Sequence, residues 1–231
     1  MARIGMAVAG LGAAAVLTAC GGSDFADGSA DDIAKSAKSA MGDLTSVTVS
    51  GEISSGGQDI NIDLQTDKDG NCTGTIGLGS GSADLLGVGG DVWMKPDESF
   101  WKTFAGTSAD QVISLVGDKW VVVPQGQDSL DQFCDIDSLL EQMLKDDDSS
   151  TYSKAGTGSV DGDDVVKIDN KDKDGSTSTG YVLVDDPHYL VKIEKTEGED
   201  TGSVTFSDFD EKVDVEAPAD SDVVDLNNLS G

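Results

Sequence analysis

Few residues of this sequence have the types and spacing that catalysis requires. The chain contains one histidine, His188, which follows Asp186-Pro187 in a turn-like context. It contains no G-x-S-x-G nucleophile motif, no P-loop and no complete G-x-G-x-x-G motif. Among 44 acidic residues, no pair of carboxylates stands out as an acid and its base. We therefore predict no enzymatic activity, no catalytic residue and no cofactor, and we interpret His188 as a polar turn residue.

Two Asp-Lys-Asp-Gly segments, at residues 67–70 and 172–175, place oxygen ligands near a glycine, as calcium-binding loops do. If each glycine took the sixth position of an EF-hand loop, the twelfth position would be Ile76 or Tyr181. Neither supplies the glutamate that closes such a site. Asp-Gly is also a common turn of β-hairpins. We therefore interpret both segments as hairpin turns and predict no metal site.

The first of the three cysteines, Cys20, has the sequence context of a lipid-attachment site. Residues 1–19 contain a single charge, Arg3, followed by an apolar run from Ile4 to Val16. They end in Leu17-Thr18-Ala19, and small residues directly before a cysteine are typical of a bacterial lipobox. We predict that residues 1–19 are a lipoprotein signal peptide and that Cys20 is the lipidated first residue of the mature protein. The alternative is a secretory signal that ends near a cysteine by chance.

Lipidation of Cys20 would hold the chain on the extracytoplasmic face of the cell membrane. Two acyl chains give a stable hold that one chain does not. Residues 20–28 are rich in glycine and small polar residues, so we predict a flexible tether there. The membrane is then a partner through the anchor alone, because anionic lipid heads repel a chain with a net charge of −29.

The charge balance also excludes a class of partner. The sequence has 15 basic and 44 acidic residues, and a phosphate backbone requires a basic binding face. We therefore predict no nucleic-acid partner. Arg3 is the only arginine, so the mature chain lacks a guanidinium group, which binds phosphates and carboxylates through two parallel hydrogen bonds. We expect a monomer.

The two remaining cysteines, Cys72 and Cys134, form an even pair in a compartment that permits disulfides. A bond between them would close a loop of about sixty residues and stabilise the fold by about 4 kcal/mol. Two buried free thiols and a redox pair are the alternatives. Neither C-x-x-C spacing nor a neighbouring histidine supports redox chemistry. We predict a disulfide.

The elements that position these residues follow from hydrophobic periodicity. Residues 29–44 predict an amphipathic helix that begins at Ser29, and a period of two then predicts strands at 47–53 and 60–64. From residue 150 onwards the pattern predicts strands only, as in an antiparallel sheet. We also expect strands near 72–79, 92–95 and 119–123, helical segments near 98–116 and 128–145, and strands at 151–158, 164–169, 177–184, 188–196, 201–209 and 213–217. No linker divides the chain, so we predict a single domain over residues 29–231.

Residues 74–90 contain seven glycines among apolar residues. Glycine weakens a strand and often marks a bend or the close approach of another segment. The stretch therefore indicates either a strongly curved sheet with an open cavity wall or a loose hairpin tip.

Several of these features together resemble the LolA/LprG-like lipoproteins of actinobacteria, of the LppX/LprAFG type. The resemblance covers roughly residues 29–226. It implies an α+β fold, a curved unclosed antiparallel β half-barrel with helices covering its concave face. The features are the lipobox, the helix that leads into Val47–Ile53, Gly70-Asn71-Cys72 with Phe133-Cys134-Asp135, Lys119-Trp120-Val121, and the closing Ala217-Pro218 and Val223-Val224.

The resemblance implies that an apolar cavity holds lipid acyl chains and that the protein carries or presents lipids at the cell envelope. One alternative is a surface-tethered interaction or sensor module with a packed core and no ligand; another is an anchored hydrolase. A carrier needs an apolar cavity of roughly several hundred Å³, and a hydrolase needs converging polar groups with shifted pKa values. Strand alternation assigns these side chains to the cavity: Ile60, Ile62, Leu64, Ile76, Leu78, Val182 and Val184.

Overall fold

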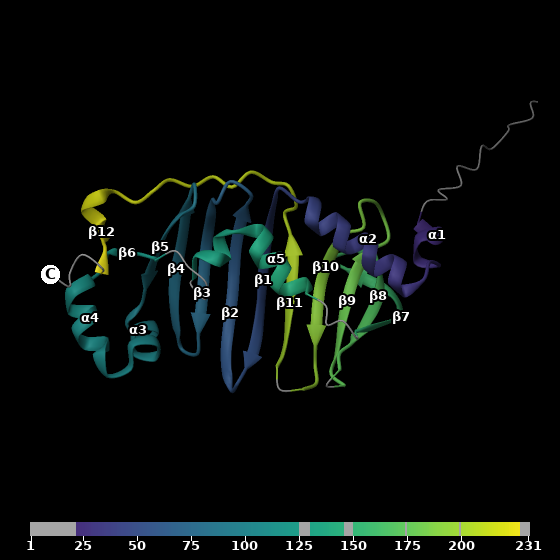
Figure 1. The fold of residues 1–231 in the computed structure, drawn as a ribbon, viewed down its shortest axis with the longest axis horizontal. Helices are drawn as coiled ribbons and strands as arrows, with labels where there is room; N and C mark the ends of the chain where they lie inside the picture. The colour runs from purple at the N-terminus through teal and green to yellow at the C-terminus, as the bar shows by residue number, and fades with distance from the viewer. Residues whose placement is uncertain (1–21, 125–129, 146–149, 174, 199, 227–231) are drawn as a thin grey trace, which may run out of the picture.

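The computed structural model describes residues 22–124, 130–145, 150–173, 175–198 and 200–226. Residues 1–19 and Cys20 lie outside the described residues. Within these residues, twelve strands form one sheet in the order β12-β6-β5-β4-β3-β2-β1-β11-β10-β9-β8-β7 (Figure 1). The strands are β1 (Ser46–Ser55), β2 (Gln58–Asp67), β3 (Cys72–Leu78), β4 (Gly81–Val88), β5 (Asp91–Pro96), β6 (Trp120–Val122), β7 (Thr151–Val160), β8 (Asp163–Lys171), β9 (Thr177–Leu183), β10 (Leu190–Lys195), β11 (Thr201–Ser207) and β12 (Val223–Val224).

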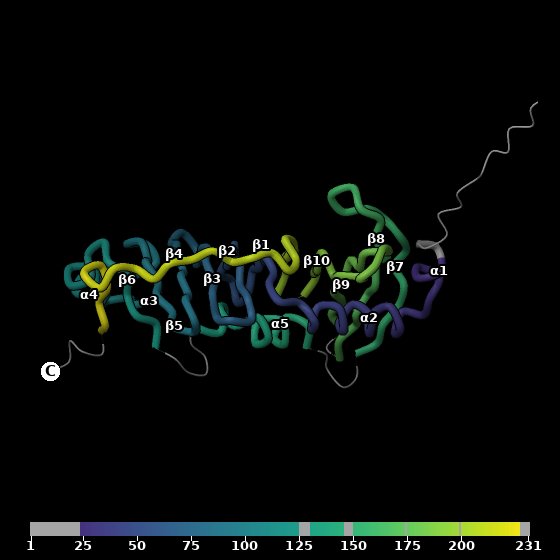
Figure 2. Tube along the Cα trace, turned by 90° about the horizontal axis from the view of Figure 1, so that it is seen from above, coloured from purple at the N-terminus to yellow at the C-terminus, as the bar shows by residue number. Residues whose placement is uncertain are grey.

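The helices lie mainly on one face of this sheet, which we call the inner face. Figure 2 shows α2 and α5 along one side of the row of strands. Among the described residues, no helix combines the length and the hydrophobicity needed to cross a bilayer. The helices are α1 (Gly22–Ala26), α2 (Ala30–Asp43), α3 (Glu98–Ala105), α4 (Ala109–Val116) and α5 (Ile136–Leu144), with short 3₁₀ turns η1 (Gly106–Ser108), η2 (Leu130–Cys134) and η3 (Asp220–Asp222).

The sheet is unclosed, with β12 and β7 as its two edges in the described chain. Neighbouring strands run antiparallel except for β12, which pairs parallel with β6. The segment from residue 208 to 222 crosses the ends of the strands to reach that edge (Figures 1 and 2). The predicted α+β fold with an unclosed sheet is confirmed, but the strand predicted at 213–217 is wrong, because this segment crosses the sheet without pairing.

Side chains alternate between the two faces of the sheet, as the period of two predicts. On β2, Ile62 and Leu64 point to the inner face and are 7% and 0% exposed. Asn61 and Asp63, on the outer face, are exposed. An antiparallel sheet with one apolar and one polar face buries only the first, so the core lies between the inner face and the helices.

Helix α2 follows the predicted helix closely. Ser29 caps its first turn, since the Ser29 hydroxyl oxygen accepts a hydrogen bond from the backbone N–H of Asp32. Ile33, Ala37 and Met41 recur at helical spacing and are buried against the sheet. This spacing directs one stripe of the helix onto the inner face.

The helical segment predicted at 128–145 is interrupted at Asp135. This residue caps α5 by accepting a hydrogen bond from Ser138 N–H, and η2 precedes it. Cys134, the last residue of η2, forms a disulfide with Cys72 on β3, with 5.1 Å between the Cα atoms. Gly87 on β4 makes room for this bond, because a Cβ atom there would lie 2.9 Å from the Cys72 sulfur. The disulfide thus fixes the start of α5 on the inner face.

The glycine-rich stretch forms most of β3 and all of β4 instead of a loose hairpin tip. A Cβ atom at Gly81 would lie 2.1 Å from the backbone nitrogen of Phe100, at the start of α3. A Cβ atom at Gly74 would lie 2.0 Å from the carbonyl oxygen of Asp63 on β2. Glycine is needed at these positions because backbone approaches backbone there.

The two Asp-Lys-Asp-Gly segments lie at hairpin turns, as predicted. Residues 68–71 connect β2 to β3, and the second segment, in which Asp174 lies outside the described residues, falls between the paired strands β8 and β9. The first turn is stabilised by Asp67, whose carboxylate accepts hydrogen bonds from the backbone N–H groups of Asp69 and Asn71. In the described part of the chain, no group of three or more His, Cys, Asp or Glu side chains could hold a metal ion.

Residues 22–28 pack against the domain, so the prediction of a flexible tether is wrong for this part. Residues 22–26 form α1, and the ring of Phe25 stacks on His188 with 3.5 Å between the ring centres. Lys154 of β7 donates hydrogen bonds to the carbonyl oxygens of Ala26 and Gly28. A ring-stacking contact and hydrogen bonds to a distant strand cannot be predicted from a composition rich in small residues.

The junction between α2 and β1 is tied to the end of β11 by Asp210. Its carboxylate accepts hydrogen bonds from the N–H and the hydroxyl of Thr45, at 2.7 and 2.9 Å, and from the hydroxyl of Tyr189. The hydrogen bond from the Thr45 N–H is the main cause of a lowered pKa for Asp210. Burial, followed by the hydrogen bond to Asp210, raises the pKa of Tyr189.

We expect Asp210→Asn to lower the free energy of unfolding at neutral pH by about 1 kcal/mol, because the amide accepts fewer hydrogen bonds. A carboxylate with a lowered pKa stabilises the fold above its unfolded pKa of about 3.9, and this contribution is lost as the pH falls through the folded value. Urea denaturation should therefore show a difference from wild type that shrinks in acid. Asp208→Asn is the control, and an equal effect of both variants would contradict this role.

Candidate functional site

An apolar cavity of about 100 Å³ lies between the inner face of β7–β10 and helices α2 and α5. Its roof consists of Ala34 and Ala37 of α2 together with Met143 and Leu144 of α5. These residues belong to the apolar faces of the two helices. Apolar residues that recur with the helical period of 3.6 share one face, and this face is turned toward the sheet. The floor consists of Ile168, Gly180, Val182, Leu190 and Ile193.

The register of the strands arranges this floor in rows of different polarity. Tyr152, Asn170 and Ser178 lie opposite one another across β7, β8 and β9, and all three line the cavity. The next row on the same face contains Ile168 and Gly180, which are two residues further along β8 and β9. Because directly paired residues share a face, the cavity has a polar end and an apolar body.

Gly180 helps to keep the cavity open. A Cβ atom at this position would lie 3.2 Å from a terminal methyl carbon of Leu190 and 3.8 Å from the carbonyl oxygen of Ile168. A larger side chain would therefore project from the floor into the cavity. In a strand, the absence of a side chain often marks a place that another group occupies.

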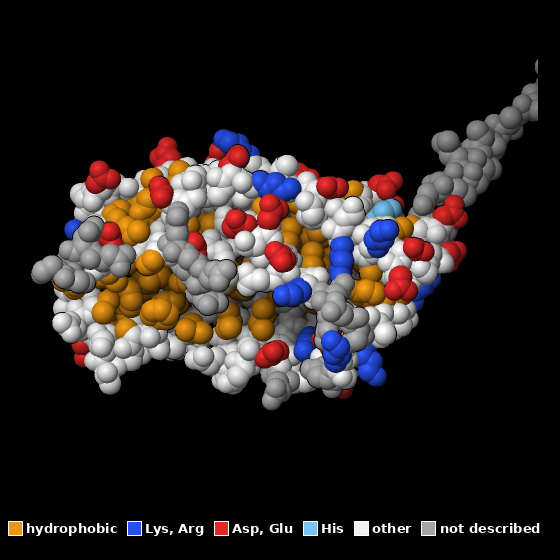
Figure 3. Space-filling view, in the orientation of Figure 1, with side chains coloured by type: hydrophobic (Ala, Val, Ile, Leu, Met, Phe, Trp, Pro, Cys, Tyr) orange, Lys and Arg blue, Asp and Glu red, His pale blue; other side chains and the backbone are white. Residues whose placement is uncertain are grey.

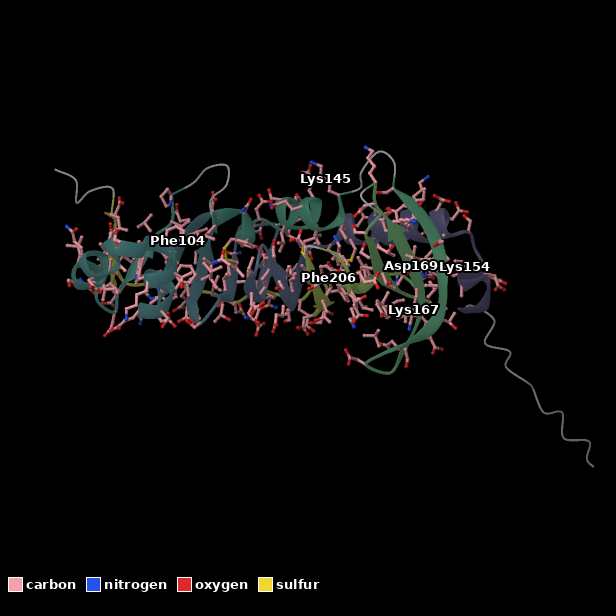
Figure 4. All side chains as sticks on the ribbon, turned by 90° about the horizontal axis from the view of Figure 1, so that it is seen from below. Phe104, Lys145, Lys154, Lys167, Asp169 and Phe206 are labelled. Atoms are coloured by element: carbon pink, nitrogen blue, oxygen red, sulfur yellow. A yellow bond between two sulfur atoms is a disulfide. The ribbon has the colours of Figure 1, made fainter. Side chains whose placement is uncertain are left out.

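Two lysines, Lys38 of α2 and Lys145 at the end of α5, line the cavity. Lys38 is half-buried and donates a hydrogen bond of 2.8 Å to the hydroxyl of Tyr152, and Lys145 is exposed. Among the described residues that line the cavity, none is an aspartate or a glutamate. Figure 4 shows Lys145 on the helical side of the sheet and Lys167 of β8 on the other side.

Of the seven residues assigned to the cavity from the sequence, the structure places one, Val182, in its lining. Val184 follows the end of β9, two residues beyond Val182. The other five lie on the same inner face but on β2 and β3, outside this lining. They are Ile60, Ile62, Leu64, Ile76 and Leu78. Whether these five contact a ligand stays a prediction.

The inner face of β2 and β3 changes in exposure along the strands. Leu64 and Cys72 are fully buried near the disulfide, whereas Ile60 and Leu78, paired at the other end, are only half-buried. Figure 3 shows hydrophobic side chains at the surface of this part of the inner face, on the side of the molecule that carries α3 and α4. An apolar surface thus continues from the helical cover toward that end of the sheet.

The sequence missed Ile168, Gly180, Leu190 and Ile193 as cavity residues. Alternation on β8 and β10 places Ile168 and Ile193 on an apolar face, so the sequence contains a signal for these two. Contacts between segments that are distant in the sequence decide which strands lie beneath the C-terminal end of α5. Local sequence patterns do not predict these contacts.

The tyrosine with the most strongly raised pKa lies outside the cavity. Tyr181, on the outer face of β9, donates a hydrogen bond of 2.7 Å to Glu194. This bond, together with burial, raises the pKa of Tyr181 to about 12, and it lowers the pKa of Glu194. The ammonium groups of Lys167 and Lys192 lie 5.2 and 5.0 Å from the centre of the Tyr181 ring. These contacts stabilise the solvent-facing side of the sheet.

Solved structures with the same fold include two mycobacterial proteins. No family model and no curated protein matches the sequence. The structure of LprF from Mycobacterium bovis superposes with a TM-score of 0.57 at 16% identity, covering 83% of this chain and all of the other. The lipoprotein LppX from Mycobacterium tuberculosis gives a TM-score of 0.51 at 16% identity, covering 80% of this chain and 97% of the other. The fold expected from the resemblance is thereby confirmed.

Proposed function

We propose that this protein is a membrane-anchored lipoprotein of the cell envelope that binds lipid acyl chains and carries or presents them there. The observation that carries this proposal is the apolar cavity between α2, α5 and the inner face of β7–β10. The fold shared with LprF and with the lipoprotein LppX supports it.

The size of the cavity limits what it holds. At about 100 Å³, it is smaller than the roughly several hundred Å³ of a typical ligand pocket. Part of one acyl chain fits, and a longer chain requires α5 to move away from the sheet. Each methylene group that leaves water contributes about 0.8 kcal/mol, so even a partly inserted chain binds favourably.

The position of α1 brings the predicted anchor close to this cavity. Figure 1 shows α1 beside β7 and β8, at the same end of the sheet as the cavity strands. The contacts of Phe25 with His188 and of Lys154 with Ala26 hold α1 there. Cys20 is two residues from Gly22, a span of at most about 7 Å. A lipidated Cys20 would therefore keep the cavity end of the domain near the bilayer.

The experiment that tests this function is native mass spectrometry of residues 21–231. This fragment contains every described strand of the single sheet and its core, so it constitutes the folding unit. We expect a fraction of the purified domain to carry a lipid that solvent extraction removes. A domain with no bound lipid, which also fails to take up added fatty acid, would favour an interaction or sensor module with a packed core.

We expect Cys20→Ser to remain in the membrane as an unprocessed precursor that still carries residues 1–19, because the serine hydroxyl does not accept the lipid. Mass spectrometry of the membrane fraction and partitioning into detergent measure this. Processing of Cys20→Ser at the wild-type site, with unchanged detergent partitioning, would contradict lipidation at Cys20.

A further inference from the structure

We propose that the end of the sheet that carries α3 and α4 docks on the surface of a lipid bilayer. The docking surface, which we call the rim, comprises residues 53–58, 77–83 and 103–109 together with Ile60. This contact would add a second attachment to the membrane, distant from the anchor proposed at Cys20. It goes beyond the proposed function, because it does not depend on the ligand of the cavity.

Three segments that are distant in the sequence meet at the rim. The turn between β1 and β2 and the turn between β3 and β4 lie at the same end of these antiparallel strands. The start of α3 is joined to the second turn, because the N–H of Asp97 donates to the carbonyl oxygen of Ser82 and the Asp97 carboxylate accepts from the Ser82 N–H. Figure 1 shows both turns and the α3–α4 connection along the lower edge of the sheet.

An apolar surface lies directly inside this edge. The register pairs Ile53 with Ile60 and Ile60 with Leu78, so these three half-buried side chains form one row on the inner face. Phe104 of α3 is 64% exposed, and its ring centre lies 6.0 Å from that of the buried Phe100. Figure 3 shows hydrophobic side chains at the surface of this region, above a lower border with few charged groups. An exposed apolar surface of this kind is typical of a contact site.

The rim has no charged residue in a strongly acidic protein. Charged residues make up 26% of the chain, and the net charge is −29, yet the residues of the rim include neither an acid nor a base. Of the neighbouring charges, Asp59 points to the outer face by strand alternation, and Lys102 lies 3.4 Å from the carboxylate of Glu98. Lipid head groups repel an acidic surface, so the rim can approach a bilayer where the rest of the protein cannot.

The composition of the rim fits a bilayer better than a protein partner. Specific protein interfaces are enriched in arginine and rely on matched polar groups at their border. The polar residues of the rim are serine, threonine and one glutamine, Gln58, and glycine is frequent among them. Short side chains let the backbone approach the head groups closely. Apolar side chains such as Phe104 enter the membrane interface without a matched partner.

The rim and the predicted anchor lie at opposite ends of the sheet. Figure 4 shows Phe104 at one end and Lys154, which contacts the chain next to α1, at the other. Twelve strands spaced by about 4.8 Å span about 50 Å. Attachment at both ends would therefore hold the sheet lengthwise along the bilayer, an orientation that the anchor alone does not impose.

A polarity-sensitive fluorophore on the rim of residues 21–231 tests this inference. Cys72 and Cys134 are bonded to each other, so Ser80→Cys supplies the single free thiol, in the turn between β3 and β4. We expect its emission to shift to the blue when phosphatidylcholine vesicles are added. Phe104→Ser should lower the partition coefficient into these vesicles at least about tenfold, because the ring no longer contributes apolar burial. Phe104 is mostly exposed, so this change leaves the core intact.

Matched variants at the two ends of the sheet provide the control. Thr107 in the rim and Thr157 on β7 are both exposed. Thr107→Asp should weaken vesicle binding, whereas Thr157→Asp, which adds the same charge, should not. A fluorophore at Thr157→Cys should show no shift.

Equal shifts at the two labelled positions, or no shift at Ser80→Cys, would overturn the docking surface. A shift that appears without vesicles and grows with protein concentration would also overturn it, because a second copy would then cover the rim. None of these results decides whether the cavity holds an acyl chain, which native mass spectrometry measures separately.

Discussion

Replacing both Cys72 and Cys134 by alanine is expected to lower the free energy of unfolding by about 4 kcal/mol. The bond joins residues separated by 62 positions, and closing a loop of this length removes much conformational freedom from the unfolded chain. It also holds η2 and the start of α5 on the inner face, where both sulfur atoms are buried. Urea denaturation of the wild type and the variant measures the difference.

Reduction of the wild-type protein provides the control for this experiment. The reduced wild type and the double alanine variant should unfold at similar urea concentrations, because both lack the cross-link. Labelling with a thiol reagent under denaturing and non-reducing conditions should find no free thiol in the domain after Cys20. Two labelled thiols, or a variant as stable as the oxidised wild type, would contradict the role of the bond.

Gly180→Leu is expected to weaken binding of a fatty acid about 50-fold with little change in stability. The leucine side chain would enter the cavity from its floor and displace about three methylene groups of the ligand, each contributing about 0.8 kcal/mol. The nearest atoms to a Cβ at this position are the end of the Leu190 side chain and a carbonyl oxygen 3.8 Å away, so the backbone accepts the substitution. Fluorescence displacement of a fatty-acid probe measures the affinity.

Gly158→Leu is the matched control for this variant. Gly158 lies on β7 and pairs with Val165, on the outer face of the same half of the sheet. Its Cβ atom would meet only the end of the flexible Lys167 side chain. Both variants replace a strand glycine by leucine, and they differ in the face that receives the side chain. Equal affinities in the two variants would show that the ligand does not occupy the cavity.

Much of the fold followed from the sequence because its signals are local. Alternation at Ile60, Ile62 and Leu64 predicted β2 and its buried face, and the Asp-Gly turns predicted hairpins. Pairing of Cys72 with Cys134 followed from the number of cysteines and the inferred compartment. The parallel pairing of β12 with β6 did not follow, because a strand of two residues leaves no pattern and its partner is about one hundred residues away.

The position of the cavity could not be predicted for a related reason. The clearest alternation belongs to β2 and β3, and Ile62, Leu64 and Ile76 were assigned to the cavity on that basis. Strong alternation marks the strands whose apolar side chains are most completely covered, so these residues are buried in packed core. The lining instead includes Gly180 and Asn170, which interrupt the apolar pattern of β8 and β9.

The central claim is that an acyl chain lies between α5, α2 and β8–β10. A crystal structure of residues 21–231 with palmitate brominated along its chain tests this most directly, because anomalous scattering locates the bromine atoms. We predict bromine peaks beside Val182, Leu190 and Leu144, and no such peaks in Gly180→Leu. Bromine on the half-buried end of β2 and β3, beside Ile60 and Leu78, or no ordered bromine at all, would contradict the claim.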